Sequence, residues 1–554
     1  MRGLAFEDGK KLEELNWILL SVLFIAGIFL RYYYWVQASP LPLDDLYFYQ
    51  GLAQAFLNQD WAHFWHFHFY PVFPILMAIV HKISGMDFEI CARGLNLIFD
   101  SLSLIPIYLI GREVFNRRVG VVAGLFWSLS YPMVRVIGEP EPVYGFFILW
   151  ALYFVFKKEA KIKDYLLAIG FASFASLIKS EASFFVLLTS LMLIFGLKSH
   201  WQKKFLLVII AGVIYLAFTS PISIQYWRAV GKFNPNPKPR TLFFIHNTIK
   251  DYQINLYGLL RDESGYYTIG QRVYIEGDRK AFKESLFGYI RTNFRELVLE
   301  YLGKLKLVFS YTLKWLLNRI YPPAMVFAFF YWLRRKKDFY LRKEIWLWLW
   351  GLGLILGICI YNPWDRFFYT LFPVLVLVSA RGLEQLVNLV DLAYSKFFPK
   401  TSLKQVLRWS IISIFVIWFI GYNLMRVSYT RPAPNLPAIF IAKQDLAKWL
   451  KPQITPQSRI MCLGFPEPFI YFLDLPFWQM VILPRVNEKL LISYAQERKV
   501  DYIFVEREDL QRNPFLKFWL SGEVKDSSVE LIKRIDEQDP ENRYPYALYK
   551  VVKP

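Results

Sequence analysis

Long apolar runs separated by short basic breaks constrain this 554-residue chain more than any other feature. Runs of about 18 or more apolar residues are typical of membrane-spanning helices, because about 20 residues of helix cross roughly 30 Å of bilayer hydrocarbon. Six stretches fit this pattern well: 16–36, 90–110, 118–136, 205–220, 344–361 and 405–425. The first stretch ends without a small-residue cleavage site, which favours a retained span over a signal peptide. The chain is therefore predicted to be a polytopic α-helical membrane protein.

The basic residues cluster in the breaks between these runs, as cytoplasmic loops do in multi-pass membrane proteins. The clusters lie at 112–118, 157–163, 198–204, 334–337 and 396–404. Placing every cluster inside predicts about eleven transmembrane helices, a cytoplasmic N-terminus and an extracytoplasmic C-terminus. The further spans are expected near 142–156, 164–178, 181–197, 318–333 and 367–380. The net charge of +20 does not indicate nucleic-acid binding, since no contiguous basic face accompanies it.

Residues 1–430 are predicted to form one transmembrane domain with two large outer loops. The first outer loop, 37–89, is expected to hold juxtamembrane helices near 46–58 and 72–84, since the second of these is too short to cross the bilayer. The long outer loop covers 221–310 and carries an amphipathic stretch towards its end.

Residues 431–554 differ in composition, with nearly balanced charge and alternating helix-like and strand-like stretches. Strands are expected at 459–463 and 502–505, and helices at 442–450 and 488–498. This alternation predicts a small extracytoplasmic α/β domain. The three cysteines of the whole chain are far apart and indicate no disulfide framework.

The most informative motif is the acidic pair Asp44-Asp45, just after the first predicted span and ahead of an aromatic-rich helix. A carboxylate at the membrane surface can take a proton from an acceptor hydroxyl or amine. A neighbouring acid and nearby apolar surface raise the proton affinity of one of the two, which suits a base. The alternative is that Asp44 only caps the helix, although Tyr47 at the third helical position provides no capping box.

Three of the six histidines, His63, His66 and His68, follow in the same loop, ahead of Tyr70-Pro71. Their spacing, with no cysteine or flanking acid, is weak for a metal site. Histidines in ordinary packing are the favoured interpretation, and an imidazole that contacts a phosphate stays open.

Ionisable residues within apolar runs indicate function by default, because burying a charge in a membrane is costly. Arg93, Asn96 and Asp100 share one face of the second span, and an internal ion pair of Arg93 with Asp100 is the favoured interpretation of that acid.

Charged residues also stand at three predicted outer turns, as Glu139-Pro-Glu141-Pro, Lys179-Ser-Glu181 and Trp364-Asp-Arg366. If these turns converge, their cations can hold a phosphate leaving group, where fixed charge lowers a reaction barrier most.

Together, these stretches resemble the membrane glycosyltransferases of the GT-C fold, and among them the protein O-mannosyltransferases and the aminoarabinose-transferase-like family. The resemblance covers roughly residues 15–425 and rests on the order of the motifs. The matching motifs are Asp44-Asp45-Leu-Tyr47, Tyr70-Pro71-Val-Phe-Pro74, Ala92-Arg93, Glu141-Pro142, Lys179-Ser-Glu181-Ala182 and Arg366-Phe-Phe-Tyr369. Tyr70 stands where the aminoarabinose enzymes have a lysine, which is a departure from their pattern.

The resemblance implies that Asp44 is the catalytic base and that Asp45 and Glu141 are lesser acids near it. The residues expected at the donor phosphate are Arg366, Lys179, Arg93, His68 and Tyr70.

The predicted function is the inverting transfer of a sugar from a polyprenyl-phosphate donor to a lipid, glycan or protein acceptor, on the outer face of the plasma membrane. No cofactor is required and no metal ligand is assigned, although a divalent cation is compatible with the fold. Three alternatives stay open: a metal-dependent oligosaccharyltransferase of the same fold, a lipid-linked sugar flippase or transporter, and a scaffolding membrane protein.

Overall fold

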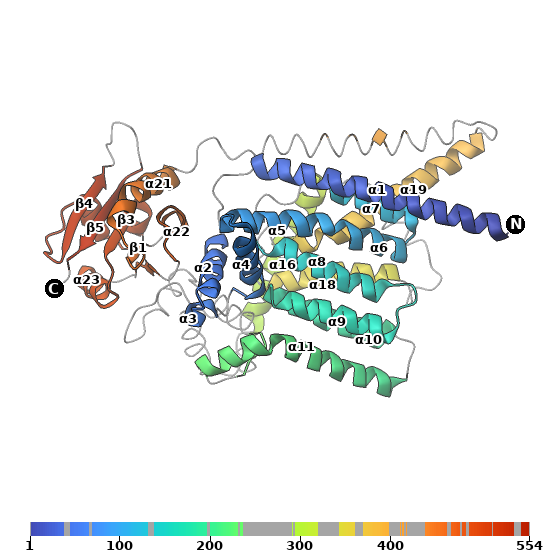
Figure 1. Ribbon diagram of the computed structural model, residues 1–554, viewed down its shortest axis with the longest axis horizontal. Coiled ribbons are helices and arrows are strands. Elements are labelled where there is room, and N and C mark those ends of the chain that lie inside the picture. Colours follow the sequence, from blue (N-terminus) through green and yellow to red (C-terminus); the bar gives the residue numbers. More distant parts are fainter. Residues whose placement is uncertain are drawn as a thin grey trace. The chain divides into compact units, whose positions relative to one another are not determined.

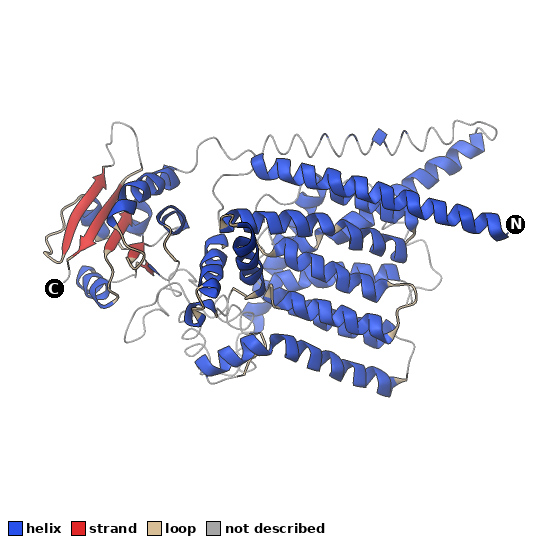
Figure 2. Cartoon of the chain, in the orientation of Figure 1, coloured by secondary structure: helices blue, strands red, loops and turns tan. Residues whose placement is uncertain are grey.

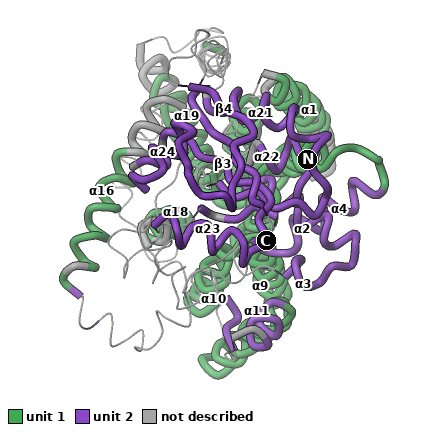
Figure 3. Tube along the Cα trace, turned by 90° about the vertical axis from the view of Figure 1, so that its left-hand side faces the viewer, with its two compact units in different colours: residues 1–42, 83–221, 295–431 green, residues 43–82, 222–294, 432–554 purple. Residues whose placement is uncertain are grey.

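The computed structural model describes most of the chain, in stretches with gaps between them. They are residues 2–37, 45–65, 69–130, 138–196, 200–230, 233–236, 291, 294–319, 343–360, 369–397, single positions between 410 and 421, 438–462, 467–476, 479–483, 487–511, 513–536 and 544–552. The chain divides into two compact units (Figure 3): the first contains 1–42, 83–221 and 295–431, and the second contains 43–82, 222–294 and 432–554.

The first unit is a bundle of helices that run alongside one another (Figures 1 and 2). Its helices are α1 (Arg2–Gln37), α5 (Phe88–Leu102), α6 (Leu104–Val114), α7 (Arg117–Leu129), α8 (Glu141–Phe156), α9 (Ile162–Ser176), α10 (Ser183–Gly196), α11 (Trp201–Val230), α16 (Phe294–Arg319), α18 (Lys343–Ile360) and α19 (Phe372–Phe397), with the short 3₁₀ helix η2 (Ser180–Ala182) ahead of α10. Because α8 is apolar on every side, it is expected inside the bundle. It packs against α5, α6, α9 and α10.

Within the described part of the chain, three helical segments are long and apolar enough to cross a membrane: Phe88–Val114, Trp201–Arg228 and Phe372–Val390. Four further apolar helices are shorter: Trp17–Tyr33, Val72–Ser84, Glu141–Phe156 and Ser180–Phe195. The prediction of a mostly helical membrane protein is confirmed, whereas the count of about eleven spans stays a prediction. The span expected at 318–333 lies almost wholly outside the described residues, and only single positions of the span at 405–425 are described.

Helices α6 and α7 approach each other closely at a pair of glycines. A Cβ atom placed on Gly120 would lie 2.6 Å from the carbonyl oxygen of Tyr108 and 3.1 Å from the amide nitrogen of Arg112. A Cβ on Gly111 would lie 2.8 Å from the Cα of Gly120. Small residues at such crossings let two membrane helices pack backbone against backbone.

Replacing Gly120 with alanine is expected to lower the free energy of unfolding by about 1–3 kcal/mol, because the added methyl group meets backbone atoms that have no room to retreat. Gly170 in α9 is a matched control, since nothing lies within 4 Å of a Cβ placed there. Gly170→Ala should leave stability unchanged or raise it slightly. Thermal unfolding in detergent measures both variants, and equal midpoints would contradict the close-packing explanation.

The second unit combines the first-loop helices with a small α/β domain. The loop forms α2 (Leu46–Leu57), α3 (Trp61–Phe64) and α4 (Val72–Ser84), which confirms the helices predicted at 46–58 and 72–84. The domain contains the helices α21 (Ala438–Leu450), η5 (Lys451–Gln453), α22 (Glu467–Leu473), α23 (Glu488–Glu497), η7 (Arg507–Gln511) and α24 (Leu516–Leu520). Its strands are β1 (Ile460–Cys462), β2 (Met480–Ile482), β3 (Tyr502–Glu506), β4 (Val529–Ile535) and β5 (Tyr546–Val551).

The strands form one five-stranded mixed sheet in the order β2-β1-β3-β5-β4. Strand β1 pairs in parallel with β2 and β3, while β5 runs antiparallel to β3 and β4. The central strand β3 is buried along its whole length, as expected for a strand covered on both faces. The strands predicted near 460 and 502 and the helices predicted near 442 and 488 are therefore confirmed, whereas the bounds of the domain and its place outside the membrane stay predictions.

Because the phenol of Tyr549 is buried, the stability of this domain is expected to fall at alkaline pH. Its hydroxyl donates a hydrogen bond to the Trp519 carbonyl, and burial raises the pKa of Tyr549 to about 12. A tyrosine in the unfolded chain titrates near pH 10. The neutral phenol therefore contributes fully to the free energy of unfolding below about pH 10, and this contribution is lost as the pH rises to about 12. Tyr549→Phe should therefore unfold at a temperature that falls less steeply across this range. Parallel curves for the two proteins would contradict this linkage.

Candidate functional site

The acidic pair stands at the start of α2. Asp45 is the N-cap residue of this helix, but its side chain makes no capping hydrogen bond. Its backbone carbonyl accepts hydrogen bonds from the amides of Phe48 and Tyr49, at 3.0 and 3.2 Å. The capping position considered for Asp44 therefore belongs to Asp45. Asp44 itself lies outside the described residues.

Tyr70 ties the first loop to the beginning of the long outer loop. Its hydroxyl donates a 2.6 Å hydrogen bond to Oδ1 of Asn236, and the side chain is buried. In the same loop, the Nδ1 atom of His63 lies 2.6 Å from Oδ2 of Asp60, which also caps α3. His66 and His68 lie outside the described residues, so a contact of either histidine with phosphate stays a prediction.

Glu141 and Lys179 form a buried ion pair in the helical bundle. Glu141 is the first residue of α8, and Lys179 lies between α9 and η2. Because α8 and α9 are joined by a short connection and pack against each other, the start of one helix lies beside the end of the other. The Lys179 ammonium donates to Oε1 of Glu141, and neither residue is more than 4% exposed. The structure thus brings together two residues that the sequence assigned to one site.

The predicted pairing of Arg93 with Asp100 is wrong. Arg93 pairs with Glu89, one turn earlier in α5, at 2.5 Å. Asp100 is two turns away from Arg93 along the same helix, whereas an i,i+4 carboxylate is an immediate neighbour. The expectation that Asp100 makes an internal ion pair is correct, but its partner is Arg31 of α1.

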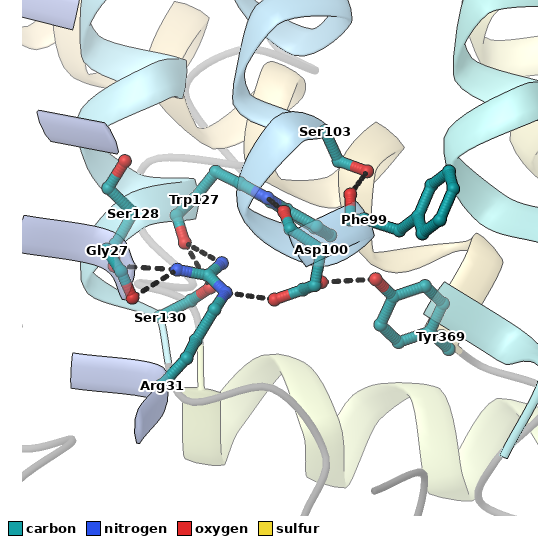
Figure 4. A network of polar contacts seen from close by, with 9 residues as sticks. All are labelled: Gly27, Arg31, Phe99, Asp100, Ser103, Trp127, Ser128, Ser130 and Tyr369. Carbon is teal, nitrogen blue, oxygen red and sulfur yellow. Dashed lines mark hydrogen bonds and ion pairs between the residues drawn. The ribbon is translucent and has the colours of Figure 1, made fainter. Parts of the chain in front are cut away.

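Arg31 and Asp100 are the centre of a buried polar network, drawn in Figure 4. One Asp100 carboxylate oxygen accepts from Arg31 and the other accepts from the Tyr369 hydroxyl. Arg31 also donates to the carbonyl of Trp127, at 2.9 Å, and to those of Gly27 and Ser128, both at 3.2 Å. The network joins α1, α5, the end of α7 and the residues just ahead of α19.

Two aromatic residues connect this network with the Glu141–Lys179 pair. The Lys179 ammonium lies 5.7 Å from the ring centroid of Tyr144, whose hydroxyl is hydrogen-bonded to Thr370. The next residue along the chain from Tyr144 is Gly145, where a Cβ would lie 2.9 Å from the ring of Tyr369. Both ion pairs therefore flank the same junction of α8 with the residues ahead of α19.

In the portion of the chain that the structure describes, no three His, Cys, Asp or Glu side chains form a group that could hold a metal ion. At the acidic turn Glu139-Pro-Glu141, the Lys179 ammonium already holds one oxygen of the Glu141 carboxylate, and this positive charge repels a metal ion. The Glu139-Pro-Glu141 turn, with Lys179 beside it, is therefore a poor fit for a resident metal. Trp364, Asp365 and Arg366 lie outside the described residues.

Arg31 and Tyr369 are the partners that the sequence reasoning missed. Arg31 carried a usable signal, because a charged residue within an apolar run is expected to find a buried partner. Glu89 also carried one, since it stands four residues before Arg93. No sequence signal predicted the partner of Tyr369, because that partner depends on how α5 packs in the bundle.

Comparison with known proteins identifies the fold. The family model for the dolichyl-phosphate-mannose-protein mannosyltransferases matches residues 70–227. No curated protein matches the chain in sequence.

Solved structures similar to this chain include one of ArnT and two of the archaeal oligosaccharyltransferase. ArnT from Cupriavidus metallidurans bound to undecaprenyl phosphate has a TM-score of 0.52 at 12% identity, over 96% of this chain and 98% of ArnT. The oligosaccharyltransferase AglB from Archaeoglobus fulgidus, in complex with an inhibitory peptide and a dolichol-phosphate, has a TM-score of 0.55 at 13% identity, over 91% of this chain and 70% of AglB. The A. fulgidus oligosaccharyltransferase in complex with Zn and sulfate has a TM-score of 0.54 at 12% identity, over 88% of this chain and 68% of that enzyme.

The shared fold and the matched family model make this chain similar to the GT-C membrane glycosyltransferases. The resemblance predicted from the motifs is thus confirmed, and the fold extends over the α/β domain as well as the helical bundle.

Proposed function

We propose that this protein is a glycosyltransferase that transfers a sugar from a polyprenyl-phosphate donor to an acceptor at the outer face of the plasma membrane. The observation that carries the proposal is the likeness to ArnT bound to undecaprenyl phosphate, which spans 96% of this chain and 98% of ArnT. The acidic pair of the first outer loop and the buried cation of the bundle support it. In this orientation the N-terminus is cytoplasmic and the C-terminal α/β domain is extracytoplasmic.

The reaction is a single displacement at the anomeric carbon. Asp44 takes the proton from the acceptor nucleophile, whose electron pair forms the new glycosidic bond. The bond between the anomeric carbon and the phosphate oxygen breaks on the opposite face, and polyprenyl phosphate leaves with that electron pair. Attack opposite to departure inverts the anomeric configuration. Because phosphate leaves readily, no strong general acid is needed.

Lys179 is the described residue best placed to stabilise the leaving phosphate. Held against Glu141, the Lys179 ammonium carries a full positive charge at a defined position, and this charge attracts phosphate oxygens. The ion pair fixes the ammonium in advance, and fixed charge is the kind that lowers a barrier most. Arg366, Arg93, His68 and Tyr70 complete the proposed phosphate site, with Asp45 as a lesser acid beside Asp44.

A metal-dependent oligosaccharyltransferase is the second candidate, because the A. fulgidus enzyme of this fold was solved with Zn. The Lys179 contact at Glu141 argues against it.

The test is label transfer by the purified full-length protein in lipid nanodiscs. Polyprenyl-phosphate sugars labelled in the sugar are offered with a crude pool of lipid, glycan and protein acceptors, with and without chelator. We expect the label to leave the prenyl lipid, chelator to have no effect, and the new linkage to have the opposite anomeric configuration. Loss of transfer with chelator supports the metal-dependent candidate. Label that crosses the bilayer while still attached to the prenyl lipid supports a flippase.

A further inference from the structure

The first turn of α2 is an anchored element that carries Asp45. Leu46 and Tyr47 are each only 1% exposed. The carbonyl of Asp45 is bonded to the amides of Phe48 and Tyr49. The packing of the buried Leu46 and Tyr47 side chains holds this turn in place. A displaced Tyr47 therefore displaces Asp45.

Tyr47 is packed against the C-terminal α/β domain. Helix α22 of that domain contacts α2, and the rings of Tyr47 and Tyr471 meet edge to face, with centroids 5.8 Å apart and planes at 63°. Edge-to-face pairs add directional preference to simple apolar burial. All of these residues belong to the second compact unit.

Helix α22 is in turn fixed to the centre of the domain. Phe469 is fully buried, and its ring lies 5.0 Å from that of Phe504 in β3. The ammonium of Lys443 lies 5.3 Å from the Phe504 ring and 3.2 Å from Oε1 of Glu506, with both charged side chains fully buried. A buried pair bonded in this way tolerates little rearrangement. The contacts thus lead without a break from the sheet through α22 to the turn that carries Asp45.

We infer that the C-terminal domain positions the first turn of α2, which carries Asp45, and that Tyr471 is the residue through which it holds that turn. This inference rests on the proposed function for its catalytic consequence. Tyr471 is a positioning residue, because it acts on Asp45 through Tyr47. A displacement of about 1 Å at a reacting group can lower a rate about a hundred-fold, so a small shift of this turn has a large effect.

The test compares Tyr471→Ala with Tyr471→Phe in the full-length protein, by two readouts. The first is hydrogen exchange of the amides in residues 45–57, which needs no substrate. Tyr471→Ala should speed this exchange several-fold through loss of the ring pair, and leave exchange in α8 unchanged. The second readout is steady-state kinetics, in which kcat should fall by about ten- to a hundred-fold with little change in the KM for the donor. Tyr471→Phe keeps the ring and should match the wild type in both.

Trp449→Ala is the matched control, because it removes an aromatic ring from the same domain at a contact that does not involve α2. The Trp449 ring lies 4.5 Å from the Lys533 ammonium. Trp449→Ala should leave both the hydrogen exchange of residues 45–57 and kcat unchanged. The inference is overturned if the amides of residues 45–57 in Tyr471→Ala exchange at the same rate as in the wild type. It is also overturned if they exchange faster while kcat is unchanged. If the wild type transfers no sugar, the proposed function fails, while the exchange result still decides whether Tyr471 positions the turn.

Discussion

Asp44→Ala is expected to lower the turnover for sugar transfer by between about 10² and 10⁴, which is the usual contribution of a general base. The loss arises because the acceptor must then attack without giving up its proton in the transition state. Donor binding should be nearly unchanged, since the proposed phosphate contacts come from Lys179 and other cations. Single-turnover rates with labelled donor, together with the KM for that donor, measure both effects.

Two controls separate a catalytic role of Asp44 from a structural one. Added formate can accept the proton in the space left by the side chain, so it should restore part of the rate of Asp44→Ala and have no effect on the wild type. Asp60→Asn changes another acid of the same loop, one whose carboxylate contacts His63, and should retain most of the activity. A rate for Asp44→Ala close to that of the wild type would exclude Asp44 as the base.

The helical architecture could be predicted from the sequence because a bilayer leaves the backbone few choices. Spanning segments must satisfy their own hydrogen bonds, so long apolar runs become helices. The runs at 90–110 and 205–220 therefore fall on helical segments long enough to cross a membrane. Strand and helix patterns in the C-terminal domain were equally readable, since alternation and turn residues act locally.

The partners of the charged residues could not be predicted in the same way, because they depend on which helices pack together. Asp100 faces Arg31 only because α1 packs against α5. Spacing alone suggested Arg93, which instead takes the nearer Glu89. The joining of Glu141 to Lys179 was anticipated only as a convergence of outer turns, and the structure gives it as a direct ion pair. The contact of the C-terminal domain with α2 had no signal in the sequence, since edge-to-face tyrosines have no fixed spacing.

Asp100→Ala is expected to lower the free energy of unfolding by about 3–5 kcal/mol, because it leaves the Arg31 guanidinium buried without its carboxylate. Both side chains of the pair are at most 4% exposed, so water cannot replace the lost partner. The double variant Arg31→Met/Asp100→Leu should recover much of this loss, since it removes both charges and fills their space with apolar atoms.

Glu300→Ala is the control, because the Glu300 side chain, paired with Lys304, is 41% exposed and such pairs contribute at most about 1 kcal/mol. Thermal unfolding of these proteins and the wild type in one detergent gives the coupling between Arg31 and Asp100 as a double-mutant cycle, once Arg31→Met and Asp100→Leu are added. If the double variant is no more stable than Asp100→Ala, the cost comes from lost packing or from the Tyr369 hydrogen bond, and the buried charge is not its source.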